Sequence, residues 1–182
     1  MTEVTTVYDR FTELAKRSLV ASRDVADSLG TDFVGTEHLL LGLAQTAGTA
    51  SEALRAQGIE LARTRAAVAA ALREAGASSS AGRGATEALS TLGIDVAEIQ
   101  QRAESTFGPG VFRYPRPAFS LRLKEVVARS LQQARELGGE HIDTEHLLLA
   151  LLADGEDAAV RVLEQLGADI RALRQSVLDR LA

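Results

Sequence analysis

The sequence of 182 residues predicts an all-α protein built from two pseudo-symmetric four-helix units. Its composition is typical of a helical domain, because hydrophobic residues make up 46% of the chain, aromatic residues only 4%, and there are three prolines. The string TEHLLL occurs twice, at 36–41 and at 144–149, and the flanking residues keep this register. An identical string within matched flanks indicates an internal duplication.

Each copy is expected to contain four helices and no β-sheet. The first helix begins after Thr12, a residue type that caps helix amino termini, and ends at Gly30. The second begins at Thr36, expected to be its cap, and Glu37 lies in its first turn, where the helix dipole favours an acid. The remaining helices of this copy are expected at about 49–57 and from about residue 60. In the second copy the helices are expected at about 120–137, 144–153, 157–166 and 170–181.

The middle of the chain does not belong to the duplication. The small residues of 76–84 predict a mobile linker, and 87–106 is expected to be a helical insert. Two glycines and three prolines within 108–117 predict an extended connector that packs across the two copies, with an arm that contacts a partner as the alternative. The predicted organisation is therefore one compact double-repeat domain, with repeat 1 at 8–75, the linker and insert at 76–118 and repeat 2 at 119–182.

Charge and composition exclude several classes of function. With 20 basic and 25 acidic residues, the net charge of −5 argues against nucleic acid as a partner and against a polybasic membrane anchor. The absence of cysteine excludes disulfides, thiolate zinc sites and cysteine nucleophiles. No apolar run approaches the roughly 18 residues of a membrane span, and the first ten residues show no signal-peptide pattern. We expect a cytoplasmic protein.

No motif for catalysis is present. The sequence lacks a phosphate-binding P-loop, HExxH and GxSxG, so we expect neither an enzyme nor a cofactor. His38 and His146 each follow a glutamate, but adjacent helical residues point about 100° apart and chelate poorly, so no metal is expected. Both histidines are expected to pack or to form hydrogen bonds near a helix start.

Two segments resemble the amino-terminal domain of Clp unfoldases, most closely that of the ClpC type. They are FTELA at 11–15 and GTEHLLLGL at 35–43, and the second copy carries related residues at 119–120 and 143–146. That domain is a double Clp repeat, which implies the double Clp-N fold here. Because the chain ends where the family's ATPase ring begins, we expect a stand-alone domain.

The resemblance implies a non-enzymatic module of Clp protein quality control that binds substrates and adaptor proteins. In the ClpC branch this domain binds phosphoarginine, the mark on proteins destined for ClpC–ClpP degradation, and in actinobacterial relatives it binds antibacterial cyclic peptides. The expected partners are phosphoarginine-bearing clients, adaptors, a ClpC-type unfoldase and such peptides, for which the protein can act as a decoy. The alternative is a regulatory or structural subunit that binds ClpC or ClpP itself with vestigial pockets. A monomer is expected.

The resemblance also implies two phosphoarginine sites, Thr12 with Glu37 and Ser120 with Glu145. A helix start offers free N–H groups and a hydroxyl to a phosphate, and a glutamate can pair with the guanidinium. The alternative is that Thr12, Ser120, Thr36 and Thr144 are only helix caps and the glutamates serve only the dipole.

The two predicted sites differ in sequence. Family members carry Arg two residues after the threonine, whereas this chain has Leu14 in the first copy and Arg122 in the second. Asp143 replaces Gly35 and adds a negative charge near a bound phosphate. The first site is therefore expected to be the better one, so that Glu37→Ala removes most binding and Glu145→Ala changes it little.

A candidate peptide-binding surface lies near the starts of the two repeats. By resemblance it consists of Tyr8, Phe11, Lys16 and Phe119. For Phe11 and Phe119, packing in the core or between the repeats is the favoured role.

Overall fold

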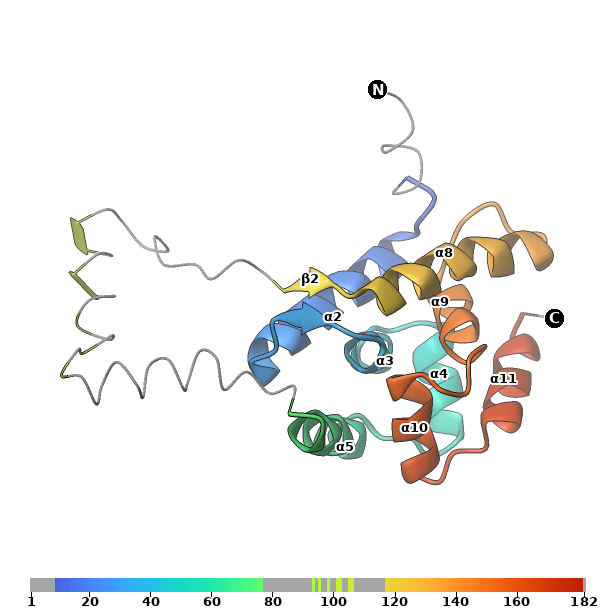
Figure 1. Cartoon of the computed structure of the whole chain (residues 1–182). Helices are drawn as coiled ribbons and strands as arrows, with labels where there is room; N and C mark the ends of the chain where they lie inside the picture. Colours follow the sequence, from blue (N-terminus) through green and yellow to red (C-terminus); the bar gives the residue numbers. More distant parts are fainter. Residues whose placement is uncertain are drawn as a thin grey trace.

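The computed structural model describes residues 9–76 and 117–181, together with isolated residues between them. The described residues form eight helices and two short strands (Figure 1). The helices of the first repeat are α2 (Glu13–Leu29), α3 (Thr36–Gln45), α4 (Thr49–Ala56) and α5 (Leu61–Glu74). Those of the second repeat are α8 (Leu121–Glu136), α9 (Thr144–Leu151), α10 (Ala158–Gln165) and α11 (Ile170–Leu178). The prediction of two four-helix repeats is confirmed, with helix ends within a few residues of those expected.

The first helix of each repeat begins at the predicted cap. The Thr12 hydroxyl accepts a hydrogen bond from the Ala15 amide at 3.2 Å, and the Ser120 hydroxyl accepts one from the Leu123 amide at 3.1 Å. Each bond satisfies one of the amides that a helix start leaves without an intrahelical partner. Helix α2 ends at Gly30, whose φ of 68° is the left-handed conformation that a side chain disfavours.

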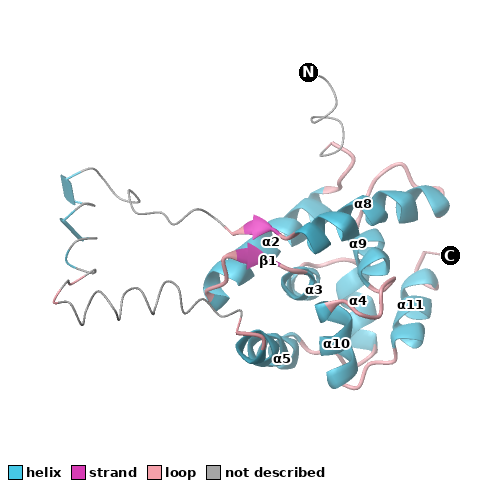
Figure 2. Cartoon of the chain, in the orientation of Figure 1, coloured by secondary structure: helices cyan, strands magenta, loops and turns pink. Residues whose placement is uncertain are grey.

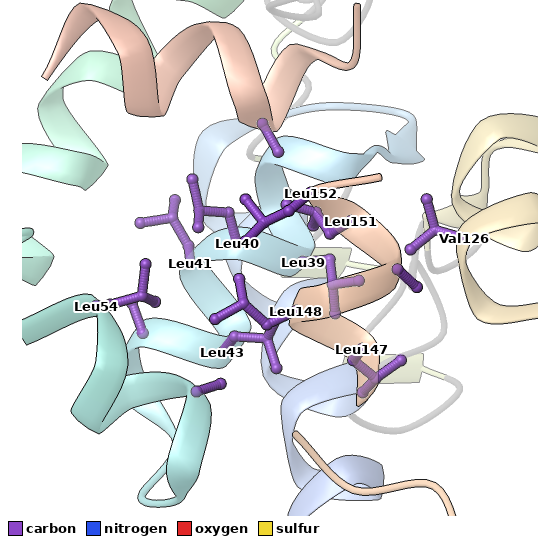
Figure 3. Close-up of a cluster of buried hydrophobic side chains, with 14 of the residues drawn as sticks. Leu39, Leu40, Leu41, Leu43, Leu54, Val126, Leu147, Leu148, Leu151 and Leu152 are labelled. Carbon is purple, nitrogen blue, oxygen red and sulfur yellow. The ribbon is translucent and has the colours of Figure 1, made fainter. Parts of the chain in front are cut away.

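Two leucine-rich helices form the centre of the molecule. Every residue from Thr36 to Ala44 in α3 and from Thr144 to Leu151 in α9 is buried. The labelled leucines of the two helices gather in one cluster in Figure 3, with Leu54 of α4 on one side and Val126 of α8 on the other. Because their leucines point in several directions, these helices have to be covered on all sides, and the other six helices supply that cover.

The predictions for the insert fall largely outside the described residues. The expected linker at 76–84 lies outside them except for Gly76, and of the expected helix at 87–106 only a few residues are described. Of these, Glu98, Gln101, Arg102, Ser105 and Thr106 are helical.

The prediction that the repeats contain no β-sheet is wrong in one respect. Strands β1 (Phe33–Val34) and β2 (Ala118–Phe119) form a two-stranded parallel sheet, drawn in magenta in Figure 2. A matching bridge joins Phe11 to Ile142. Both pairings cross between the repeats, because the extended residues that enter one repeat need partners for their backbone groups. Elements of two residues are too short for a hydrophobic period to reveal.

The predicted role of Thr36 and Thr144 as caps of their own helices is also wrong. The caps are Gly35 and Asp143, one residue earlier. Each threonine hydroxyl instead accepts a hydrogen bond from a backbone amide at the start of a helix in the other repeat. Thr36 accepts from Ala159 of α10 at 3.4 Å, and Thr144 accepts from Ala50 of α4 at 3.5 Å. The two repeats are therefore interlocked at their centre.

Candidate functional site

The start of each repeat lies against the other repeat. The Thr12 amide donates to the Ile142 carbonyl at 2.9 Å, three residues before Glu145. The Ser120 amide donates to the Val34 carbonyl at 3.0 Å, three residues before Glu37. The candidate residues therefore gather at two ends of the domain, here called the Thr12–Glu145 end and the Ser120–Glu37 end.

The structure does not bring Thr12 and Glu37, the expected pair, together. Thr12 caps the start of α2, whereas His38, next to Glu37, lies 3.2 Å from the hydroxyl of Thr31, just beyond the end of α2. The 17 residues of α2 span about 25 Å, so its two ends cannot share one small ligand. The same crossing places Asp143 beside Thr12 rather than beside Ser120.

Glu37 is a buried carboxylate that folds back over its own helix start. Its side chain is only 7% exposed, and Oε1 lies 2.9 Å from Nδ1 of His38. Gly35 makes this position possible, since a Cβ atom there would lie 2.3 Å from Glu37 Oε1. Nδ1 of His38 already accepts the Gly35 amide, so among the described residues the carboxylate receives no hydrogen bond. A buried carboxylate with so few donors favours a cationic partner.

Glu145 is the equivalent residue of the second repeat, but its side chain is placed differently. It accepts a hydrogen bond from the Thr144 hydroxyl at 3.3 Å and lies 3.8 Å from Nδ1 of His146. Asp143 has a side chain where the first repeat has Gly35, so the folded-back position of Glu37 is not open to Glu145. Glu145 accordingly lies farther from its histidine than Glu37 does.

The histidines close the starts of α3 and α9. Nδ1 of His38 accepts the Gly35 amide and Nδ1 of His146 accepts the Asp143 amide, each at 3.0 Å. The prediction that they form hydrogen bonds near a helix start is confirmed. Burial lowers the pKa of His146, and the nearby Glu145 and Asp143 oppose that shift only in part. The neutral imidazole is the form that can accept the amide.

Arg122 is held by three carboxylates beside the Ser120–Glu37 end. Nε donates to Asp157 at 2.6 Å, Nη1 donates to Glu125 at 3.1 Å, and Nη2 donates to Asp154. Asp157, then Glu125 and Asp154, raise the pKa of the guanidinium. The pKa of Asp154 is lowered, chiefly by the Glu156 amide and then by Arg122. Sequence analysis identified Arg122 but missed its partners, because two of them lie more than 30 positions away.

The candidate peptide-binding residues have mostly structural contacts. Phe11 is 5% exposed and belongs to the core, which confirms packing as its role. Phe119 is partly buried against the core, and the guanidinium of Arg23 lies 4.7 Å from the centre of its ring. Lys16 pairs with Glu13 at 2.9 Å and lowers the pKa of that carboxyl. Tyr8 lies outside the described residues.

The described residues contain neither a metal-binding cluster nor a helix that could span a membrane. No group of three or more His, Cys, Asp or Glu side chains is placed to hold a metal ion. No described helix has the length and apolar character needed to cross a membrane.

The chain belongs to the family of Clp repeat amino-terminal domains. The family model described as the Clp repeat (R) N-terminal domain matches residues 10–104 and 118–182. These two matches contain both TEH motifs and both ends of the candidate site. The resemblance seen in the sequence is thereby confirmed.

Curated relatives carry this domain within much longer chains. The chaperone protein ClpB of Oceanobacillus iheyensis is 34% identical over 175 residues, which are 96% of this chain and 17% of ClpB. The negative regulator of genetic competence ClpC/MecB of Bacillus subtilis is 33% identical over 175 residues, again 96% of this chain and 17% of the relative. This chain thus spans about a sixth of the length of these relatives.

Solved structures agree with the fold. The amino-terminal domain of the chaperone ClpD from Arabidopsis thaliana matches with a TM-score of 0.62 and 29% identity over 95% of each chain. The Hsp104 amino-terminal domain from Candida albicans matches with a TM-score of 0.58 and 12% identity, over 93% of this chain and 90% of that one. The second match supports the fold alone.

Proposed function

We propose that this domain is a non-enzymatic receptor of the Clp system that binds substrates or adaptor proteins and recognises phosphoarginine. The proposal keeps the four candidate residues Thr12, Glu37, Ser120 and Glu145 and changes their pairing. Thr12 acts with Glu145, and Ser120 acts with Glu37.

The observation that carries the proposal is the crossing of the two repeats. At each end, the cap residue of a long helix is hydrogen-bonded through its backbone amide to a residue, Ile142 or Val34, that lies three positions before a buried glutamate of the other repeat. A phosphate suits the helix start, because the first amides of a helix have no intrahelical partner. A guanidinium suits the glutamate, because a carboxylate accepts two parallel hydrogen bonds from it.

Phosphoarginine carries these two groups on one side chain. Phosphoserine offers only the phosphate and free arginine only the guanidinium. Each therefore contacts either the helix start or the glutamate of an end, but not both. We therefore expect selectivity for phosphoarginine over both. Because each end is built from both repeats, binding also requires the repeats to remain docked.

The test is thermal unfolding of the full chain with phosphoarginine, phosphoserine or arginine. At a hundredfold excess over the dissociation constant, a ligand stabilises the folded state by about 2.7 kcal/mol. For a domain of this size that corresponds to a rise in Tm of about 5–10 °C. We expect this rise with phosphoarginine only.

The double variant Glu37→Gln/Glu145→Gln should lose the response, because an amide does not neutralise a guanidinium. The matched control is Glu74→Gln/Glu164→Gln, which removes the same charge from exposed positions near the ends of α5 and α10. Equal shifts with phosphoserine, or none with phosphoarginine, would overturn the proposal. Capture of ClpC or ClpP by a protein that binds no phosphoarginine would favour the regulatory-subunit alternative.

A further inference from the structure

The two ends of the domain differ at a pair of equivalent positions. Two residues after the helix cap, the Thr12–Glu145 end has Leu14 and the Ser120–Glu37 end has Arg122. At the residue that precedes the third helix of each repeat, the first repeat has Gly48 and the second has Asp157. The charged pair Arg122–Asp157 thus occurs in one repeat, and an uncharged pair takes its place in the other.

Asp157 is free to hold Arg122 because another residue caps its helix. Asp157 stands at the N-cap of α10, yet its side chain makes no capping hydrogen bond. The Ala159 amide, which an N-cap aspartate would ordinarily bind, donates to the Thr36 hydroxyl instead. The Asp157 side chain is 1% exposed, with Oδ1 bonded to Arg122 and Oδ2 buried without a partner.

Charge around Arg122 opposes the entry of a phosphate. One guanidinium faces the three carboxylates of Glu125, Asp154 and Asp157, so the group as a whole is negative. Its Nε and both Nη atoms already donate to these carboxylates. An arginine near a helix start would ordinarily assist phosphate binding, but here the carboxylates hold it and add repulsion.

The two ends also differ in the position of their glutamate side chains. Glu37 is folded back over Gly35, whereas Asp143 excludes that position for Glu145. Asp143 adds a single negative charge at the Thr12–Glu145 end, fewer than the carboxylates around Arg122.

We propose that Asp154 and Asp157 hold Arg122 as an internal guanidinium ligand, an arrangement here called the latch, which closes the Ser120–Glu37 end to phosphorylated ligands and leaves the Thr12–Glu145 end receptive. This inference rests on the proposed function. It keeps the expected ranking of the helix starts, with Thr12 above Ser120, and reverses the expected ranking of the glutamates, with Glu145 now above Glu37. Arg122, Asp154 and Asp157 are thus the residues that determine specificity at the Ser120–Glu37 end.

The test is a titration of the ¹⁵N-labelled full chain with phosphoarginine, followed by amide chemical shifts. In the unmodified protein, the amide signals of 12–15 should shift at ligand concentrations at least about tenfold lower than those of 120–123. The reason is that charges at close range change an affinity by about this factor. The variant Asp154→Asn/Asp157→Asn, which keeps the side-chain shapes, should bring 120–123 into the same concentration range. Adding Arg122→Met to that variant should remove the gain.

The control is Glu74→Gln/Glu164→Gln, which changes the net charge equally and should leave both responses as they are. If both ends of the unmodified protein respond at the same concentration, the latch is wrong while phosphoarginine recognition stands. If the aspartate variant gains nothing at 120–123 while 12–15 still respond, the latch is also wrong. If no protein responds at either end, phosphoarginine recognition fails and the latch fails with it.

Discussion

Gly42 of α3 lies directly against the backbone of α2, and adding one methyl group there tests the packing of the first repeat. A Cβ atom at residue 42 would lie 2.4 Å from the carbonyl oxygen of Ser18 and 3.0 Å from the amide nitrogen of Ser22. Both atoms belong to the backbone of α2. No side-chain rotation can relieve the contact, so Gly42→Ala requires the two helices to move apart.

We expect Gly42→Ala to destabilise the protein, although alanine has the higher helix propensity. Glycine to alanine inside a helix ordinarily gains about 1 kcal/mol. Overpacking a dense core costs about 1–3 kcal/mol, and a clash with backbone lies at the upper end of that range. Gly42→Ala should therefore lower the free energy of unfolding by about 2 kcal/mol. For a chain of this length the Tm should fall by about 4–8 °C.

The assay is thermal and urea unfolding followed by circular dichroism. Ala150 occupies the equivalent position in α9, which makes Ala150→Gly the matched control. It removes a methyl group and should cost about 1 kcal/mol in propensity together with a small cavity. A Gly42→Ala protein that unfolds at or above the temperature of the unmodified protein would refute the close crossing of α2 and α3.

Two further predictions concern the junction of the repeats and the start of α9. Thr36→Val and Thr144→Val each remove the acceptor for a helix amide of the other repeat and should each cost about 1 kcal/mol. Both variants should lower the midpoint of a single urea unfolding transition that the two repeats share. Two separate transitions would contradict the interlocking of the repeats. Burial lowers the pKa of His146 below 6.5, so the unfolded chain binds this proton first as the pH falls. Stability should decline below about pH 6.5, and His146→Gln, which keeps an acceptor at that position, should reduce the decline; an unchanged pH profile would contradict this.

The sequence alone determined the elements of this protein and their repetition. The caps Thr12 and Ser120, the left-handed Gly30 and the TEHLLL helices were all predictable, because capping, chain reversal and apolar periodicity depend on neighbours within a few positions. The same string of residues also carried the family resemblance. The choice of the four candidate site residues came from that resemblance, and each of them stands at a predicted helix start.

Only the tertiary structure decided which of these residues meet. Val34 pairs with Phe119, Phe11 with Ile142, and Thr36 reaches a helix start 123 positions away. These contacts arise because α3 and α9 are rich in leucine and are buried on every side, which requires the two repeats to enclose them together. That docking carries the start of each repeat to the glutamate of the other, and no local pattern in the chain records it.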